Sequence, residues 1–216
     1  MEYIVQIASR RRQTMNNGHM PNHSFVPDDI AARYEVFEWR NGIAILSAAH
    51  PEKWADILAV LRGFSFSTSD VMMPGGAKGL IASKLDSHFT KLGWVEKKFE
   101  TKIVVDEAEH AAPTHKVDCY KDRVALEVEW NNKDPFYDRD LNNFRLLFDL
   151  RAIDVGVIIT RCSELQTIFN ELGRGPSFGN STTHMAKLLP RLEGGSGGGC
   201  PVVVFGIRAT CYVKDK

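Results

Sequence analysis

The stretch from Val117 to Trp130 reads VDCYKDRVALEVEW, and the interpretation of the whole chain depends on it. HKVDCY and RVALEVEW are rich in apolar and β-branched residues around the turn-forming pair KD, so they predict a β-hairpin. Three carboxylates, Asp118, Glu127 and Glu129, stand among these apolar residues. Acids are rarely buried unless something compensates their charge. The function of the chain therefore depends on what these three acids do.

The hairpin brings the three acids together. Side chains alternate between the two faces of a strand, so Glu127 and Glu129 share one face, opposite to Val124, Leu126 and Val128. Asp118 lies on the preceding arm, across the turn at Lys121 and Asp122. We therefore expect the three carboxylates to converge on one side of the hairpin.

Carboxylates this close repel one another and resist ionising, and a hard divalent cation compensates their charge. Magnesium takes oxygen ligands, activates water and neutralises charge on a phosphate. The arrangement D-x8-E-V-E therefore predicts Mg²⁺-assisted phosphodiester hydrolysis. On the pattern alone, the alternative is a solvent-facing acidic hairpin with Glu129 opposite a lysine.

The rest of the chain predicts a mixed α/β domain in residues 31–216, preceded by an N-terminal extension or flexible arm in residues 1–30. Helical spacing of apolar residues predicts helices at 51–64, 77–94, 136–152, 163–172 (with Ser163 as N-cap) and 183–192. Besides the hairpin, β-branched runs predict strands at 98–106, 153–160 and 201–209. Linkers, turns or loops are expected at 65–76, 107–114, 131–135, 173–183 and 193–199.

Bulk composition limits the class of protein. The chain has 216 residues, 44% hydrophobic and 25% charged, which is ordinary for a soluble globular protein. No apolar run reaches the roughly 20 residues of a membrane span, and the N-terminus does not resemble a secretory signal, so we expect no membrane association and a cytoplasmic protein. The formal net charge of zero gives no indication of nucleic-acid binding, but a basic surface and an acidic metal site cancel in such a sum. The four cysteines lack metal-ligand spacing and are expected to be reduced.

The segment DCYKDRVALEVEW, followed by a helix and then IDVGVIIT, resembles the type II restriction endonucleases of the BglII/BstYI group, which have the PD-(D/E)xK nuclease fold. The resemblance is closest from Asp118 to Leu165 and extends more weakly back to about Tyr34 and forward through GNSTTH to PVVVFGI. It implies a mixed central sheet flanked by helices. It also implies Mg²⁺-dependent cleavage of double-stranded DNA in the cytoplasm of a bacterium or archaeon.

Active-site residues carry over one by one from this resemblance. Asp118 matches the first acid of the motif and Glu127 the second, nine positions later, so both are expected to bind the metal. Glu129 stands where most enzymes of the fold have lysine and BglII-like enzymes have glutamine, and glutamate there resembles BamHI. It is expected to help activate water or only to bind metal. Glu96 is the expected fourth active-site residue, with Lys97 as the alternative.

Two loops are expected to read DNA bases in the major groove, where short polar side chains reach base edges. The first follows the hairpin directly and holds Asn131, Asn132 and Lys133. The second, GRGPSFGNSTTH, offers Arg174, Ser177, Asn180, Ser181, Thr182, Thr183 and His184. A simple helix cap by Asn180 or Ser181 is the alternative for part of this loop.

The resemblance also implies a homodimer that cuts a palindrome, because two-fold protein symmetry then matches two-fold DNA symmetry. A GATC core is expected within that palindrome. Two rival hypotheses remain from the sequence: a nuclease of the same fold without palindrome specificity, which serves repair or acts on RNA, and a DNA-binding module without catalysis. A neighbouring methyltransferase gene would favour the restriction enzyme over both.

Overall fold

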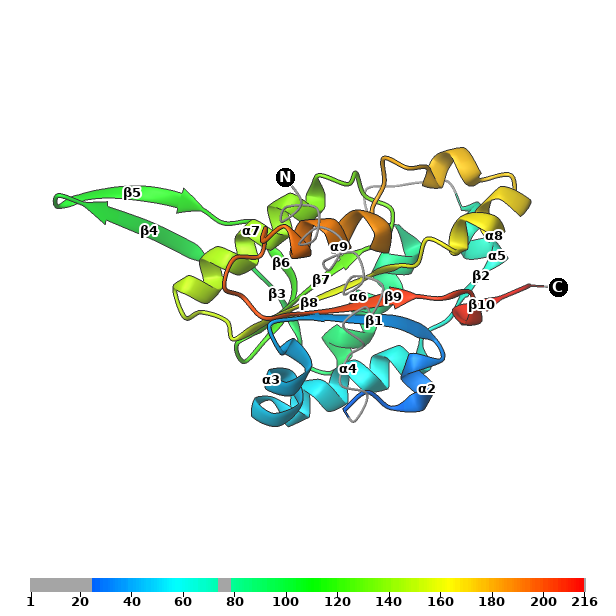
Figure 1. Ribbon diagram of the computed structural model, residues 1–216, viewed down its shortest axis with the longest axis horizontal. Helices are drawn as coiled ribbons and strands as arrows, with labels where there is room; N and C mark the ends of the chain where they lie inside the picture. Colours follow the sequence, from blue (N-terminus) through cyan, green and yellow to red (C-terminus); the bar gives the residue numbers. More distant parts are fainter. Residues whose placement is uncertain (1–24, 74–78, 216) are drawn as a thin grey trace, which may run out of the picture.

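The computed structural model describes residues 25–73 and 79–215. Within these ranges the main sheet has six strands in the order β1-β9-β8-β7-β6-β3 (Figure 1). The strands are β1 (Tyr34–Trp39), β3 (Val95–Lys97), β6 (Val117–Lys121), β7 (Val124–Glu129), β8 (Val155–Arg161) and β9 (Val202–Ile207). The three central strands β7, β8 and β9 are parallel, whereas β1, β6 and β3 run antiparallel to their neighbours. The sheet is therefore mixed, as the sequence predicts.

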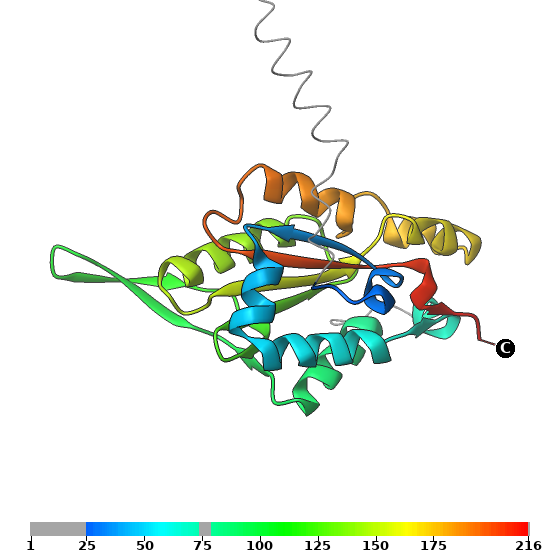
Figure 2. The same cartoon turned by 60° about the horizontal axis from the view of Figure 1, so that its bottom comes forward.

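Helices cover both faces of this sheet (Figures 1 and 2). On one face lie α2 (Asp28–Ala31), α3 (Gly42–Ala49), α4 (Pro51–Gly63) and α6 (Leu80–Lys91). α5 (Thr68–Met72) and α8 (Leu165–Glu171) lie at the end of the sheet, where their buried residues join the same apolar cluster (Figure 1). On the other face lie α7 (Phe136–Asp149) and α9 (Met185–Glu193). Short 3-10 turns at Gly175–Phe178 and Ala209–Cys211, and a small sheet of β2 (Phe66–Ser67) with β10 (Tyr212–Val213), complete this body.

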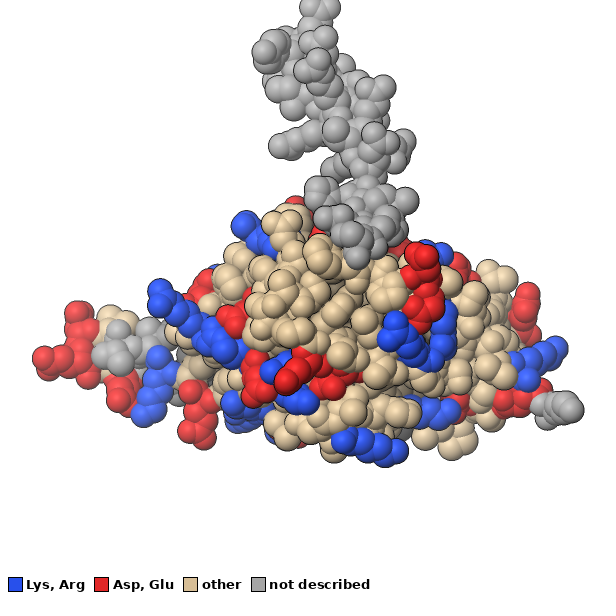
Figure 3. Space-filling model, turned by 90° about the horizontal axis from the view of Figure 1, so that it is seen from below, with Lys and Arg blue, Asp and Glu red and all other residues tan. Residues whose placement is uncertain are grey.

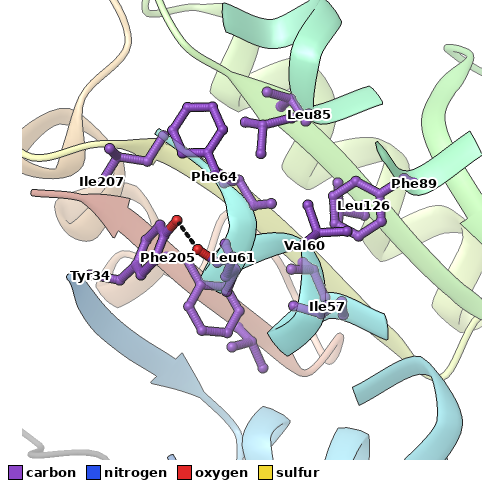
Figure 4. Packing of buried hydrophobic residues seen from close by; sticks show 14 of the residues in the cluster. Tyr34, Ile57, Val60, Leu61, Phe64, Leu85, Phe89, Leu126, Phe205 and Ile207 are labelled. Carbon is purple, nitrogen blue, oxygen red and sulfur yellow. Dashed lines mark hydrogen bonds between the residues drawn. The ribbon is translucent and has the colours of Figure 1, made fainter. Parts of the chain in front are cut away.

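The two faces of β7 belong to two separate apolar layers. Val124, Leu126 and Val128 pack into the larger cluster beneath α4 and α6, whereas Ala125 packs into the cluster beneath α7 and α9. Figure 4 shows Leu126 among side chains of the larger cluster, together with the hydrogen bond from the Tyr34 hydroxyl to the Leu61 carbonyl at 2.8 Å. The predicted alternation along β7 is thus confirmed, and it turns Glu127 and Glu129 towards α7.

The β6–β7 hairpin turns one residue later than expected. Lys121 pairs with Val124, so the turn consists of Asp122 and Arg123, and both have positive φ angles of +38° and +71°. Two residues with positive φ are the requirement of the tight hairpin turn that matches strand twist. Arg123 Nε also donates to Asp154 Oδ2 at 2.7 Å, which ties the turn to the start of β8.

The strand β1 and the helix α3 were not predicted. Tyr34–Trp39 forms β1 and pairs with β9 along its whole length, and Gly42–Ala49 forms α3. The strand is half-buried without strict alternation, so its periodicity is weak. Pairing with β9, more than 160 residues later in the chain, determines its structure, and no local pattern reports such a partner.

The loop prediction at 107–114 was wrong. Ala108–Pro113 forms β5, which pairs antiparallel with β4 (Glu100–Val105) in a separate two-stranded sheet that projects from the body (Figure 1). Alanine-rich sequence has little intrinsic β preference, so the ladder with β4 decides the conformation. The exposed tip carries Asp106, Glu107 and Glu109, and Figure 3 shows acidic side chains at that end.

Two smaller local expectations were also wrong. Part of the predicted linker at 65–76 is the short helix α5, which starts with a capping box between Ser67 and Asp70. Ser163 does not cap α8, because the N-cap residue is Glu164 and the Ser163 hydroxyl lies 3.0 Å from His184 Nδ1.

The expected extension lies mostly outside the described residues. This applies to residues 1–24, including the basic run Arg10–Arg12. Val26 and Ile30, by contrast, are buried in the larger apolar cluster, so the last part of the 1–30 segment packs on the domain. No helix in the described ranges has the length and apolar character that crossing a membrane requires.

Gly156 on β8 leaves space for the α7 layer. A Cβ at this position would lie 2.4 Å from Phe144 Cδ2, and Phe144 is fully buried. We expect Gly156→Ala to lower the free energy of unfolding by about 1–3 kcal/mol, because overpacking shifts the buried ring and α7 with it. Urea unfolding measures this change. Gly63→Ala is the matched control, since a Cβ at Gly63 meets nothing within 4 Å. Equal midpoints for Gly156→Ala and wild type would contradict the prediction.

Candidate active site

Asp118 and Glu127 are held against each other by the two strands of the hairpin. The Asp118 backbone N–H donates to Glu127 Oε2 at 3.2 Å, and the Val128 backbone N–H donates to Asp118 Oδ2 at 3.1 Å. The ladder between β6 and β7 ends at the pair Cys119–Leu126, just before these residues. Each carboxylate therefore replaces a backbone acceptor of the opposite strand, and this exchange fixes the two acids side by side.

Glu129 lies further along β7, against α7. Its Oε2 accepts a hydrogen bond from Asn132 Nδ2 at 2.8 Å, and its Oε1 lies 3.5 Å from Arg139 Nη2. Both Glu127 and Glu129 are 1% exposed, whereas Asp118 is half-buried. The structure therefore places these three predicted residues on the α7 side of one hairpin.

A further acid, Asp140 on α7, belongs to the same group and was not predicted from the sequence. It is fully buried, and Arg139 Nε donates to its Oδ1 at 2.9 Å. The position of Asp140 in the sequence indicates that it is buried, because it stands three residues after the buried Tyr137 and four before the buried Phe144. An acid on the apolar stripe of an amphipathic helix marks a polar partner inside the protein.

The electrostatics of the group follow from burial. Burial, then the charges of Asp140 and Asp118, raise the pKa of Glu127 well above its usual range. Burial, then Asp140, raise the pKa of Glu129 to about 9, although the bond from Asn132 and the charge of Arg139 oppose this. Burial also raises the pKa of Asp140. In the absence of a cation, Glu129 therefore holds a proton at neutral pH and shares it with Asp140.

One observation favours a divalent cation beside these acids: Glu127 Oε1 is a buried oxygen without a hydrogen-bond donor. A buried carboxylate oxygen that lacks a donor is costly unless a cation satisfies it. Across the residues that the structure describes, no three His, Cys, Asp or Glu side chains already form a metal-ligand group. Mg²⁺ commonly uses one or two carboxylates and completes its shell with water and phosphate, so Asp118 and Glu127 suit it.

Glu96 and Lys97 lie on β3, the strand beside β6. Glu96 is exposed and accepts a hydrogen bond from Lys116 Nζ at 2.8 Å. Lys97 Nζ lies over the rings of Phe99 and Tyr120, 4.6 Å and 4.2 Å from their centroids. Glu96 thus occupies the strand next to Asp118, while Lys97 is engaged by aromatic rings.

The two predicted base-reading loops lie against each other. The Thr183 N–H donates to the Asn132 carbonyl at 2.9 Å, and the Asn132 N–H donates to the Thr183 hydroxyl at 3.1 Å. Lys133 pairs with Thr182 in an isolated antiparallel bridge, and the Asp134 N–H donates to the Ser181 carbonyl at 3.0 Å. The loops therefore form one surface unit next to Glu129.

Within this unit the predicted residues differ in exposure. The exposed ones are Asn132, Lys133, Ser177, Asn180 and Ser181. The half-buried ones are Asn131, which donates through Nδ2 to the Ser177 carbonyl at 3.0 Å, and Arg174. Thr182 and Thr183 are buried, and their hydroxyls accept hydrogen bonds from inside the protein. The N-cap of α9 is His184, so neither Asn180 nor Ser181 caps that helix.

Comparison with known proteins gives one family. The model described as restriction endonuclease BglII/BglIII matches residues 34–207. This range begins with β1 and ends with β9, so it contains the whole main sheet and every predicted site residue. No curated protein matches the chain.

The raised pKa of Glu129 predicts how stability depends on pH. This pKa is about 9 in the folded protein and near 4.5 in the unfolded chain. Between pH 4.5 and pH 9 the folded state therefore binds more protons than the unfolded state. The stability that Glu129 contributes is thus present below pH 4.5 and is lost as pH rises towards 9. In metal-free buffer at pH 8, we expect Glu129→Gln to be more stable than wild type by at least about 1.4 kcal/mol, the equivalent of one pKa unit.

Urea unfolding from pH 5 to pH 9 with a chelator tests this prediction. Glutamine keeps an acceptor for Asn132 and a donor for Asp140, so the variant removes the titration and little else. The control is Glu171→Gln at the exposed end of α8. The prediction fails if Glu129→Gln leaves the pH slope of the unfolding free energy unchanged.

Proposed function

Because the chain belongs to the restriction endonuclease BglII/BglIII family, we propose that it is a Mg²⁺-dependent type II enzyme that cleaves double-stranded DNA. The proposed target is a short palindrome with a GATC core, and cleavage leaves 5′-phosphates. The observation that carries this proposal is the pair of hydrogen bonds that fixes Asp118 and Glu127 side by side across the hairpin, within the range that the family model matches. Membership in the family makes the chain a nuclease acting on DNA, and the finer statements are the proposal.

In this proposal Asp118 and Glu127 hold Mg²⁺ through their carboxylate oxygens. A magnesium ion held there would activate water for attack and neutralise charge on the scissile phosphate. Glu127 presents an oxygen that lacks any donor, and Asp118 stays fixed by the Val128 N–H. These contacts orient both ligands before the ion arrives. Glu96, on the adjacent strand, is proposed as the fourth active-site residue.

Glu129 is proposed to orient the attacking water and to accept its proton. For this it must be ionised, and two neighbours favour the ionised form: Asn132 as a hydrogen-bond donor and Arg139 as a cation. Asp140 disfavours it, since a second charge at this depth repels the first. A divalent cation near Glu127 lowers this repulsion, so Glu129 is expected to act as a base only in the loaded enzyme.

The DNA is proposed to lie across the loop unit. Asn180, Ser181 and Lys133 are exposed there and can reach base edges or phosphates. Figure 3 shows the opposite side, near α3 and α4, where acidic and basic side chains are mixed and neither sign forms a continuous field. The position of the acids and the polar loops on the same side of the sheet supports this placement. A homodimer would present two such units to the two halves of a palindrome.

Digestion of methylation-free phage DNA with Mg²⁺ tests the proposal. We expect discrete fragments whose ends map to one palindrome with a GATC core. Glu127→Ala should lose cleavage by at least about 100-fold, as it removes a metal ligand. Glu52→Ala, on the exposed side of α4, is the matched control and should cleave like wild type.

The other outcomes separate the rivals. A smear that disappears in Glu127→Ala would retain the nuclease and refute the site-specific reading. Binding of DNA that is equal with and without Mg²⁺, and no cleavage with any divalent metal, would favour a binding module.

Asn180 provides a separate prediction about base reading. If its exposed amide contacts a base pair, Asn180→Ala should reduce discrimination at one position of the site by about 5- to 150-fold, equivalent to 1–3 kcal/mol. Cleavage of a set of duplexes with single substitutions measures this. The control is Asn142→Ala on the exposed face of α7. A uniform loss at all positions would instead assign Asn180 to phosphate binding.

A further inference from the structure

A continuous chain of hydrogen bonds joins Glu129 to the second loop. Asn132 Nδ2 donates to Glu129 Oε2 at 2.8 Å, and the Asn132 backbone N–H donates to the Thr183 hydroxyl at 3.1 Å. The Thr183 N–H returns a bond to the Asn132 carbonyl at 2.9 Å. The backbone of Asn132 is thus fixed at both polar groups, and its amide is committed to an active-site acid.

The second loop is in turn anchored to the end of strand β8 by Arg161. Arg161, at the end of β8, is 1% exposed and donates through Nη2 to the Phe178 carbonyl at 2.9 Å and to the Thr182 hydroxyl at 2.8 Å. Its guanidinium lies 5.4 Å and 5.8 Å from the ring centroids of Phe169 and Phe178. A buried arginine with these bonds restrains the segment from Phe178 to Thr183 as one body.

We infer that Asn132 is a positioning residue for Glu129, and that it transmits the placement of the second loop to the cleavage step. The inference rests on the proposed function and adds how that enzyme would discriminate between sequences. It also reassigns Asn132, which the sequence suggests as a base reader.

The reassignment follows from the geometry of the amide. Glu129 holds one of the two N–H groups of Asn132, so the orientation of this amide is set by an active-site acid. Movement of this amide towards a base would therefore lengthen its bond with Glu129. The fixed backbone of Asn132 leaves only side-chain rotation for such a movement.

The consequence concerns the rate of cleavage more than affinity. Most of the affinity for DNA comes from phosphates, which a mismatched site also offers. A mismatch that displaces the second loop would shift Thr183, then Asn132, then the acid that orients water. Misplacement of a catalytic group by about 1 Å costs on the order of 100-fold in rate. Discrimination should accordingly reside in kcat.

Thr183→Val tests this series of hydrogen bonds, because it removes the hydroxyl that bonds Asn132 and keeps the shape of the buried side chain. Asn132→Ala removes the donor to Glu129. We expect both variants to lower kcat on the cognate duplex by about 10- to 100-fold with little change in KM. Metal-free binding of cognate and mismatched duplexes should stay within about 3-fold of wild type. The ratio of kcat between cognate and mismatched duplexes should fall.

Thr183→Ser keeps the hydroxyl and should restore most of kcat, and Asn142→Ala should match wild type. Thermal unfolding shows whether each variant is folded, and Asn132, which is exposed, should tolerate alanine. Cognate binding that weakens while kcat is retained would overturn the inference and return Asn132 to base reading. A loss in Thr183→Ser as large as in Thr183→Val would also overturn it. A wild type that cleaves no DNA would instead refute the proposed function, and the inference with it.

Discussion

The burial of several carboxylates on one side of β7 is the constraint on which the rest of the structure depends. Glu127, Glu129 and Asp140 are almost completely removed from water, and burial raises the pKa of each. Such a group is tolerated only where donors and cations compensate for it. The backbone N–H of Asp118, the amide of Asn132 and the guanidinium of Arg139 provide part of this compensation. Glu127 Oε1 still lacks a donor, and this unsatisfied buried oxygen is what suits the site to a cation.

The fold supplies this arrangement through the point where β6 separates from β7. Up to Cys119 the strands share an ordinary antiparallel ladder, and at Asp118 side chains take over as acceptors. On its other side β7 is paired in parallel with β8 along its whole length, so it cannot follow β6 away. The helix α7 then covers the acids and adds Asp140 and Arg139 from consecutive positions. The stable parallel centre of the sheet thus holds the charged hairpin in place.

Local patterns in the sequence predicted the helices and strands whose conformation depends on neighbouring residues in the chain. The hairpin, β8, β9 and the helices α4, α6, α7 and α9 follow from alternation or helical spacing, and the two faces of β7 follow from its register. The strands that the sequence did not predict depend on pairing with another strand. β1 is a strand because β9 lies beside it, and β5 is a strand because β4 lies beside it. Asp140 was missed for the same kind of reason. Its place on the apolar stripe of α7 indicates burial, but its partners Glu127 and Glu129 become clear only once α7 is known to lie over them.

The predicted base readers illustrate how a residue type can suggest more than one role. Asparagine and threonine in a loop suit contact with bases, and they equally suit hydrogen bonds that hold loops together. The structure assigns the second use to Thr182 and Thr183, whose hydroxyls are buried and bonded to Arg161 and Asn132. Asn180 and Ser181, which stand between the same anchors, remain exposed. An exposed side chain on a restrained loop meets DNA with little loss of conformational freedom, and this is the arrangement that favours specific contact.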